Sequence, residues 1–130
     1  VTGVQTCALP IYSTYVHLNS RISELWMGNK KFCKILQNNN FKLNHGTYNV
    51  SLAYPSSSLD GLLIVLLKDN EIKAYIQIGN DLSYIVDSPN ICVGCTNIND
   101  TLKGSITAYK LLRRKIKQAL QLNREITIKL

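Results

Sequence analysis

One stretch of this chain, residues 105–122, repeats its apolar side chains at helical spacing, and this feature limits the available folds more than any other. Its apolar positions are Ala108, Tyr109, Leu112, Ile116, Ala119 and Leu120. Elsewhere, β-branched and aromatic residues gather in short runs separated by turn-forming residues, which is typical of strands. The sequence therefore predicts an α+β domain: a mostly antiparallel, β-sandwich-like sheet with one C-terminal amphipathic helix followed by a final strand.

The expected strands follow one another with short connections. They cover residues 15–18, 22–27, 31–36, 47–54, 62–67, 72–78 and 125–130. Gly28-Asn29 and Asp69-Asn70 have the turn chemistry of hairpins, while Ser105 is a good N-cap for the helix and Asn123 can cap its end. The longest apolar run, at 62–67, is far shorter than the roughly 20 residues of a membrane-spanning helix, so no membrane segment is expected.

Residues 1–11 have a different character from the rest. Their sequence, VTGVQTCALPI, looks like the in-frame translation of a sequencing-library adapter and not like part of a gene product. We therefore expect residues 12–130 to form a single β-rich domain, with residues 1–11 outside the fold. Because this segment hides the natural start, the cytoplasm is only the default compartment, and a secretion signal further upstream stays open.

The net charge of +7 is concentrated near the C-terminus. Residues 101–130 hold eight Lys and Arg against Glu125, whereas the rest of the chain is balanced. The anion-binding candidates share one face of the predicted helix: Lys110, Arg113, Arg114 and Lys117. Such a face attracts nucleic acid or an anionic wall polymer, yet it is more often simply solvated. A basic nucleic-acid-binding module is thus an alternative, although nucleic acid is not the partner we expect.

Five sequence motifs occur in order along the chain. They are ISELWMGNKKFCKIL at 22–36, HGTYNV at 45–50, YIQIGN at 75–80, Asp87 followed by ICVG at 91–94, and Ser105 with its helix and the closing ITIKL at 126–130. Together they resemble a family of small domains of unknown function that is common in bacteriophages, prophages and gut bacteria. The resemblance covers nearly the whole chain after Tyr12 and implies a phage- or prophage-associated domain.

The layout of these motifs is more distantly similar to that of the cysteine L,D-transpeptidases, which act on peptidoglycan peptides. In those enzymes a Cys thiolate attacks a stem-peptide carbonyl, a His on the neighbouring strand takes the thiol proton, and backbone N–H groups stabilise the oxyanion. The resemblance places the His at Gln77 and the Cys at Asn90, or at Ile91 in a second alignment. None of these three side chains can perform that chemistry.

The neighbouring positions Gly79, Asn80 and Asp87 do match the family pattern, and with Gln77 and Asn90 they would shape a cleft. The resemblance therefore implies a non-catalytic relative of an L,D-transpeptidase-like frame that acts as a binding or structural module. Cell-wall peptide and a phage structural protein are the partners it suggests. No cofactor and no metal are expected.

Cys92 keeps an enzymatic alternative open. It lies two residues after Asn90 on the same face of an extended strand, so cysteine-dependent acyl transfer by a displaced Cys92, with His45 as its base, is a second hypothesis. Cys92 and Cys95 also form a C-x-x-C pair, but one such pair supplies only half of a tetrahedral zinc site, and a thioredoxin-like βαβ setting is missing. Packing as a small apolar side chain is the commoner role for a cysteine on a strand, including Cys33.

Overall fold

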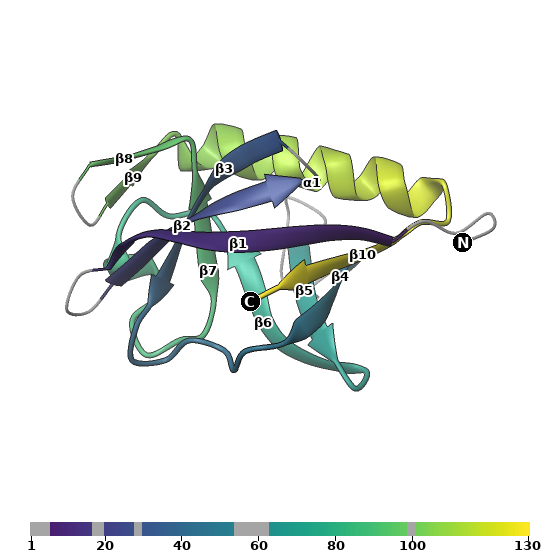
Figure 1. Cartoon of the computed structure of the whole chain (residues 1–130), viewed down its shortest axis with the longest axis horizontal. Coiled ribbons are helices and arrows are strands. Elements are labelled where there is room, and N and C mark those ends of the chain that lie inside the picture. The colour runs from purple at the N-terminus through teal and green to yellow at the C-terminus, as the bar shows by residue number, and fades with distance from the viewer. Residues whose placement is uncertain (1–5, 17–19, 28–29, 54–62, 99–100) are drawn as a thin grey trace.

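The computed structural model describes residues 6–16, 20–27, 30–53, 63–98 and 101–130. Within these ranges, eight strands close into a barrel (Figure 1). In order around the barrel they are β1 (Thr6–Val16), β10 (Glu125–Lys129), β4 (Thr47–Ala53), β5 (Leu63–Lys68), β6 (Glu71–Gln77), β7 (Ile91–Gly94), β3 (Lys30–Asn38) and β2 (Ser20–Met27). The remaining elements are the hairpin of β8 (Thr96–Ile98) and β9 (Thr101–Lys103), the 3-10 helix η1 (Leu82–Tyr84) and the helix α1 (Ser105–Gln121).

This arrangement confirms the predicted α+β class, with dominant strands and a C-terminal helix followed by a final strand. The sheet is mostly antiparallel, but β1 pairs with β10, and β6 with β7, in parallel. A tight turn cannot join parallel strands, so the chain between β6 and β7 needs a long connection. Residues 78–90 form that connection and contain η1 and most of the predicted site.

Two predicted hairpins are present. β2 and β3 pair along most of their length, although the expected turn at residues 28–29 lies outside the described residues. β5 and β6 are joined by Asp69 and Asn70, which both have the positive φ (55° and 61°) of the tightest hairpin turns. β3 continues past its predicted end to Asn38, because Gln37 and Asn38 are buried and extend the pairing with β2. The ends of other predicted strands, at residues 17–18, 54 and 62, also lie outside the described residues.

The structure differs from the expectation that residues 1–11 lie outside the fold. β1 begins at Thr6, and residues 6–10 pair in parallel with β10. From Ile11 onward β1 pairs with β2, so this strand joins two sheet edges and closes the barrel. Closure satisfies backbone groups that an open edge would expose. Backbone pairing depends little on side-chain identity, which is why the unusual sequence of this segment does not predict its exclusion.

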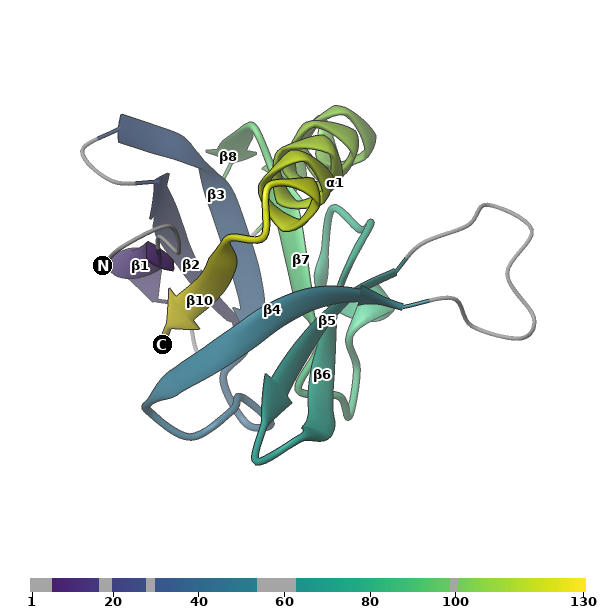
Figure 2. The same ribbon diagram turned by 90° about the vertical axis from the view of Figure 1, so that its right-hand side faces the viewer.

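α1 packs its apolar face on the barrel. Figure 2 shows the helix nearly end on, lying over the barrel between β3 and β4. Ala108, Tyr109, Leu112 and Ile116 of α1 join the main core cluster with inward-facing strand residues such as Ile64. Burying a side chain such as Leu112 stabilises the fold by about 1.5–3 kcal/mol, so α1 is an integral part of the core. No helix among the described residues is long and apolar enough to cross a membrane.

The two ends of α1 differ in how well the sequence predicts them. Asn123 has a positive φ of 57° and its N–H donates to the carbonyl of Leu120, so it ends the helix as expected. The N-cap prediction is wrong: Gly104, with φ of 65°, is the N-cap and Ser105 is the first helical residue. The Ser105 hydroxyl is instead buried, where it accepts a hydrogen bond from the N–H of Gly79 (2.8 Å).

Candidate functional site

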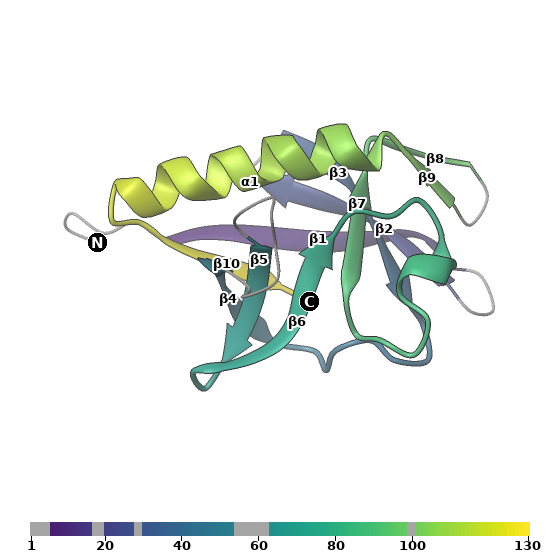
Figure 3. The same ribbon diagram turned by 180° about the vertical axis from the view of Figure 1, so that it is seen from behind.

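The candidate site is the connection between β6 and β7. Figure 3 shows this connection passing through η1 and returning beside β6. Asp81 caps η1 by accepting a hydrogen bond from the N–H of Ser83 (2.9 Å). Ile85, directly after η1, is fully buried in a small core cluster with Ile22 and Leu36. The connection therefore packs on the barrel at its middle, through Ile85, as well as joining it at both ends.

Gln77 and Asn90 meet at the two ends of this connection. Nδ2 of Asn90 donates to Oε1 of Gln77 (3.0 Å), and Oδ1 of Asn90 accepts a hydrogen bond from the backbone N–H of Tyr75 (2.9 Å). Nε2 of Gln77 donates to the carbonyl of Tyr84 in η1 (2.8 Å). Both amides thus use both of their polar atoms, and they tie β6, η1 and the start of β7 together. We call this Gln77–Asn90 pair the amide bridge.

The amide bridge occupies the two positions that the resemblance assigns to a base and a nucleophile. Such a pair must lie within hydrogen-bond distance, and Gln77 and Asn90 do. A neutral amide has no basic nitrogen and no thiol or hydroxyl, so it can hold a peptide group or position a loop but cannot perform nucleophilic acyl transfer. Ile91, the other candidate position for the nucleophile, is buried in the main core.

Gly79 and Asn80 are in close contact with the residues around the connection. A Cβ atom on Gly79 would lie 2.7 Å from Cβ of Tyr84 and 2.8 Å from Sγ of Cys92, so only glycine fits there without a shift of its neighbours. Asn80 receives two hydrogen bonds: its Oδ1 accepts from the N–H of Ser105 (3.4 Å), and its carbonyl accepts from the N–H of Leu102 (2.6 Å). These contacts hold the connection against β9 and the start of α1.

Asp87 occupies a bend on the far side of η1. It is exposed and has a positive φ of 55°, a conformation that Asp adopts more readily than most residues. Two positions further on, Pro89 precedes Asn90, whose N–H donates to the hydroxyl of Ser88 (3.1 Å). Asp87 therefore helps the chain turn back toward β7.

The structure does not bring Cys92 and His45 together. Cys92 is fully buried in the cluster that holds Leu36 and Ile85, whereas His45 is exposed in the loop before β4 and lies outside that cluster. Burial, with a smaller contribution from Asp81, raises the pKa of the Cys92 thiol to about 12. At neutral pH this thiol stays protonated and is a poor nucleophile.

The C-x-x-C pair has neither a zinc nor a disulfide geometry. Cys92 is buried in β7, whereas Cys95 is exposed at the bend that follows β7 and directs its Sγ to the carbonyl of Gly104 (3.6 Å). Burial, and to a lesser extent Cys95, raises the pKa of Cys33 to about 12. Cys33, Cys92 and Cys95 are free, and among the described residues no three His, Cys, Asp or Glu side chains are placed to hold a metal ion.

The four anion-binding candidates share an outward face of α1. Lys110, Arg114 and Lys117 are exposed, and the guanidinium of Arg113 lies 5.4 Å from the centroid of the Tyr109 ring. α1 contains no acidic residue. This face therefore presents a positive stripe to solvent, whose attraction for anions is limited by ionic strength.

No sequence pattern indicates a second cationic group, on the barrel itself. Lys42, Lys68 and Lys73 line a pocket of about 390 Å³ beside Tyr48. The Lys68 ammonium lies 5.2 Å from the centroid of the Tyr48 ring, and the Lys73 ammonium is 2.8 Å from a carboxylate oxygen of Glu71. Lys68 and Lys73 flank the turn of the β5–β6 hairpin, whereas Lys42 comes from a loop much earlier in the sequence, so only the folded barrel brings Lys42 to the other two.

Comparisons with protein-family models, curated proteins and solved structures found no match to this chain. The geometry of the amide bridge and its surroundings is therefore the main guide to function. That geometry joins Gln77 and Asn90, and it separates Cys92 from His45.

Proposed function

We propose that this chain is a small phage- or prophage-associated domain that binds a partner without catalysis, on a frame related to that of the L,D-transpeptidases. The observation that carries the proposal is the amide bridge. Its 3.0 Å hydrogen bond joins the residues at the expected base and nucleophile positions, and both side chains are engaged in holding the backbone. A pair used in this way fixes the shape of the connection and leaves no group to attack a carbonyl.

The enzymatic alternative would need a displaced nucleophile. Cys92 is the candidate, but a general base must come within hydrogen-bond distance of the proton it removes. The Cys92 thiol is instead enclosed by apolar side chains, with Gly79 directly beside its sulfur. Desolvation disfavours a thiolate at such a position, which supports a packing role for Cys92.

The connection also offers a surface on which a peptide can bind. Ile78, Tyr84 and Val86 are 39%, 56% and 60% exposed, and all three belong to residues 78–90. Exposed apolar side chains beside polar groups are typical of interaction surfaces. We therefore propose a cell-wall stem peptide as the ligand, while a phage structural protein is the other partner that the resemblance suggests.

The test is a titration of the isotopically labelled full chain with a diaminopimelate-containing stem peptide, followed by NMR. We expect saturable shifts of backbone amides within residues 78–90, and weaker binding by Tyr84→Ala. Phe41→Ala is the matched control, because Phe41 is a 44% exposed aromatic residue outside the connection. Absence of shifts, or equal weakening by both substitutions, would contradict a peptide-binding site at the connection.

A further inference from the structure

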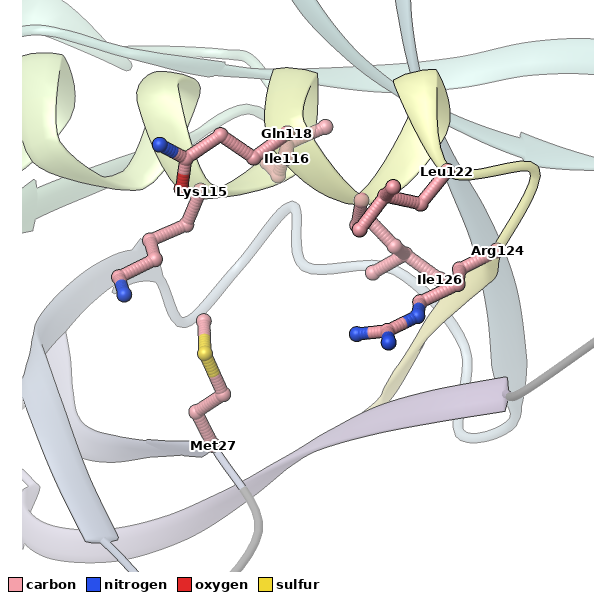
Figure 4. Close-up of a pocket in the computed structure, with 8 residues that line it drawn as sticks. Met27, Lys115, Ile116, Gln118, Leu122, Arg124 and Ile126 are labelled. Carbon is pink, nitrogen blue, oxygen red and sulfur yellow. The ribbon is translucent and has the colours of Figure 1, made fainter.

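A second pocket lies at the other end of α1 from the amide bridge. It has a volume of about 250 Å³ and opens between the C-terminal part of α1, Arg124 after the helix, Ile126 of β10 and Met27 at the end of β2 (Figure 4). The amide-bridge connection contacts the first residue of α1, Ser105, whereas this pocket is lined by residues from Lys115 onward. The two sites are therefore separate.

The walls of this pocket are mostly apolar. The apolar lining residues are Met27, Ile116, Ala119, Leu122 and Ile126, and Gln118 adds a neutral amide. Leu122 is 60% exposed, so the apolar surface continues to the rim. Met27 adds a flexible thioether, which adapts to ligands of different shape. A pocket of this kind favours an apolar occupant because the transfer of hydrocarbon out of water lowers the free energy.

Two cationic side chains enter the same pocket. Figure 4 shows Lys115 extending from α1 and Arg124 from the chain after the helix, both toward the side on which Met27 lies. Neither makes an ion pair with any described residue. Their charged ends lie on opposite sides of Met27 in this view, so each adds positive charge to one side of the pocket, and the Arg124 fork can bind a carboxylate or phosphate with two hydrogen bonds.

We infer that this pocket binds a small amphiphilic anion, with a carboxylate or phosphate head held by the Arg124 guanidinium, the Lys115 ammonium adding a favourable charge, and an unbranched hydrocarbon tail lying against Met27, Ile116 and Leu122. The volume is below the ~300–1,000 Å³ of sites for drug-sized ligands. A single short chain of about six to ten carbons is therefore the occupant that fits. Each buried methylene of the tail strengthens binding by about fourfold.

The first experiment titrates the full chain with sodium octanoate, monitored by NMR. About ten non-hydrogen atoms correspond to a Kd of about 5–10 mM or tighter. Octan-1-ol and octylammonium keep the tail but change the head, and butyrate keeps the head but shortens the tail. We expect octanoate to bind at least tenfold more tightly than any of the three, and octyl phosphate to bind as well as octanoate.

Two variants locate the site. Lys115→Gln combined with Arg124→Gln is expected to weaken octanoate binding at least tenfold, while the control Lys110→Gln with Lys117→Gln, on the outward face of the same helix, leaves it unchanged. Ala119→Leu fills the pocket, so it is expected to abolish binding with no loss of melting temperature. All four substituted cations are exposed, so the charge variants are not expected to unfold the protein.

The inference is overturned if octanoate does not bind, if octan-1-ol binds as tightly, or if the two charge variants lose affinity equally. It is also overturned if Ala119→Leu folds and retains full octanoate binding. Should Ala119→Leu fail to fold, the comparison of the two charge variants decides alone.

Discussion

The amide bridge joins three backbone segments through only two side chains. Gln77 reaches the carbonyl of Tyr84, and Asn90 reaches the N–H of Tyr75, while the two amides bond to each other. Removing either side chain therefore leaves a polar atom of the other without its partner. An unsatisfied polar group costs about 1–3 kcal/mol when buried and less when water can reach it, as it can at these partly exposed residues.

A double-mutant cycle measures this coupling. Gln77→Ala and Asn90→Ala are each expected to lower the free energy of unfolding by about 1 kcal/mol, and the double variant by about 0.5–1.5 kcal/mol less than the sum of the two. Urea unfolding supplies the three values. Gln77→Ala with Asn40→Ala, an exposed residue elsewhere, is the control pair and should be additive. Additivity of Gln77 and Asn90 would show that the bridge does not stabilise the folded state.

Because the pKa of the buried Cys92 thiol is raised, we expect the free energy of unfolding to fall at alkaline pH. Its pKa is raised from 9.0 to about 12 by burial and by Asp81, so above pH 9 the unfolded chain releases this proton while the folded chain keeps it. The stabilisation is complete below pH 9 and declines as the pH rises toward 12, by up to about 1.4 kcal/mol per pH unit. Urea unfolding at pH 8, 9 and 10.5 measures the decline.

Cys92→Ala should make this decline shallower than in the parent protein. Val93→Ala is the control, because it removes a buried aliphatic side chain from the same strand without removing a titrating group. It should lower stability equally at each pH. An unchanged pH dependence in Cys92→Ala would show that the thiol titrates normally and is more accessible than the structure indicates.

At the scale of elements, the start of α1 shows why some contacts cannot be predicted from local sequence. The helical repeat predicts α1 correctly to within a residue at its end. The polar groups at its start are satisfied instead by residues 79–80, which follow β6 and lie some 25 residues earlier in the chain. Local capping rules favour Ser105 as the cap, but the long-range contacts with Gly79 and Asn80 determine its actual role.

Asn80 is therefore expected to support α1 from outside the helix. Asn80→Ala removes the side-chain acceptor for the N–H of Ser105 and should lower the free energy of unfolding by about 1 kcal/mol. Asn80→Asp keeps an acceptor and adds a negative charge beside the helix N-terminus, so it should preserve or raise stability. Thermal unfolding measures both, with the exposed Asn40→Ala as reference. Equal melting temperatures for Asn80→Ala and the parent would show that this contact does not stabilise the folded protein.

The outward face of α1 should bind polyanions only through non-specific charge. Fluorescence anisotropy with a labelled DNA duplex is expected to show binding at low salt that is lost near physiological salt, since each phosphate contact releases counterions. Arg114→Glu with Lys117→Glu should abolish it, whereas Lys42→Glu with Lys73→Glu should have a smaller effect. Sequence-selective binding that persists at physiological salt would favour the nucleic-acid-binding alternative.

At the scale of the whole molecule, most strands of the barrel can be predicted from local sequence, but the parallel pairs that complete the barrel cannot. Alternating apolar residues and turn signals identify β2 to β6, and the helical repeat identifies α1. The parallel pairs β1–β10 and β6–β7 depend on contacts between distant segments, which no local pattern encodes. The amide bridge exists because of the second of these pairs. Its residue types are visible in the sequence, but its hydrogen bonds are not.

The intact mass of the full chain after incubation with a diaminopimelate-containing stem peptide tests the central claim most directly. A competent cysteine L,D-transpeptidase run alongside shows that the peptide can acylate a thiol. We predict that this chain keeps its mass, because the amide bridge holds no nucleophile and Cys92 is buried and protonated. An acyl adduct that maps to Cys92 and disappears in Cys92→Ala would contradict the account and establish a displaced catalytic cysteine.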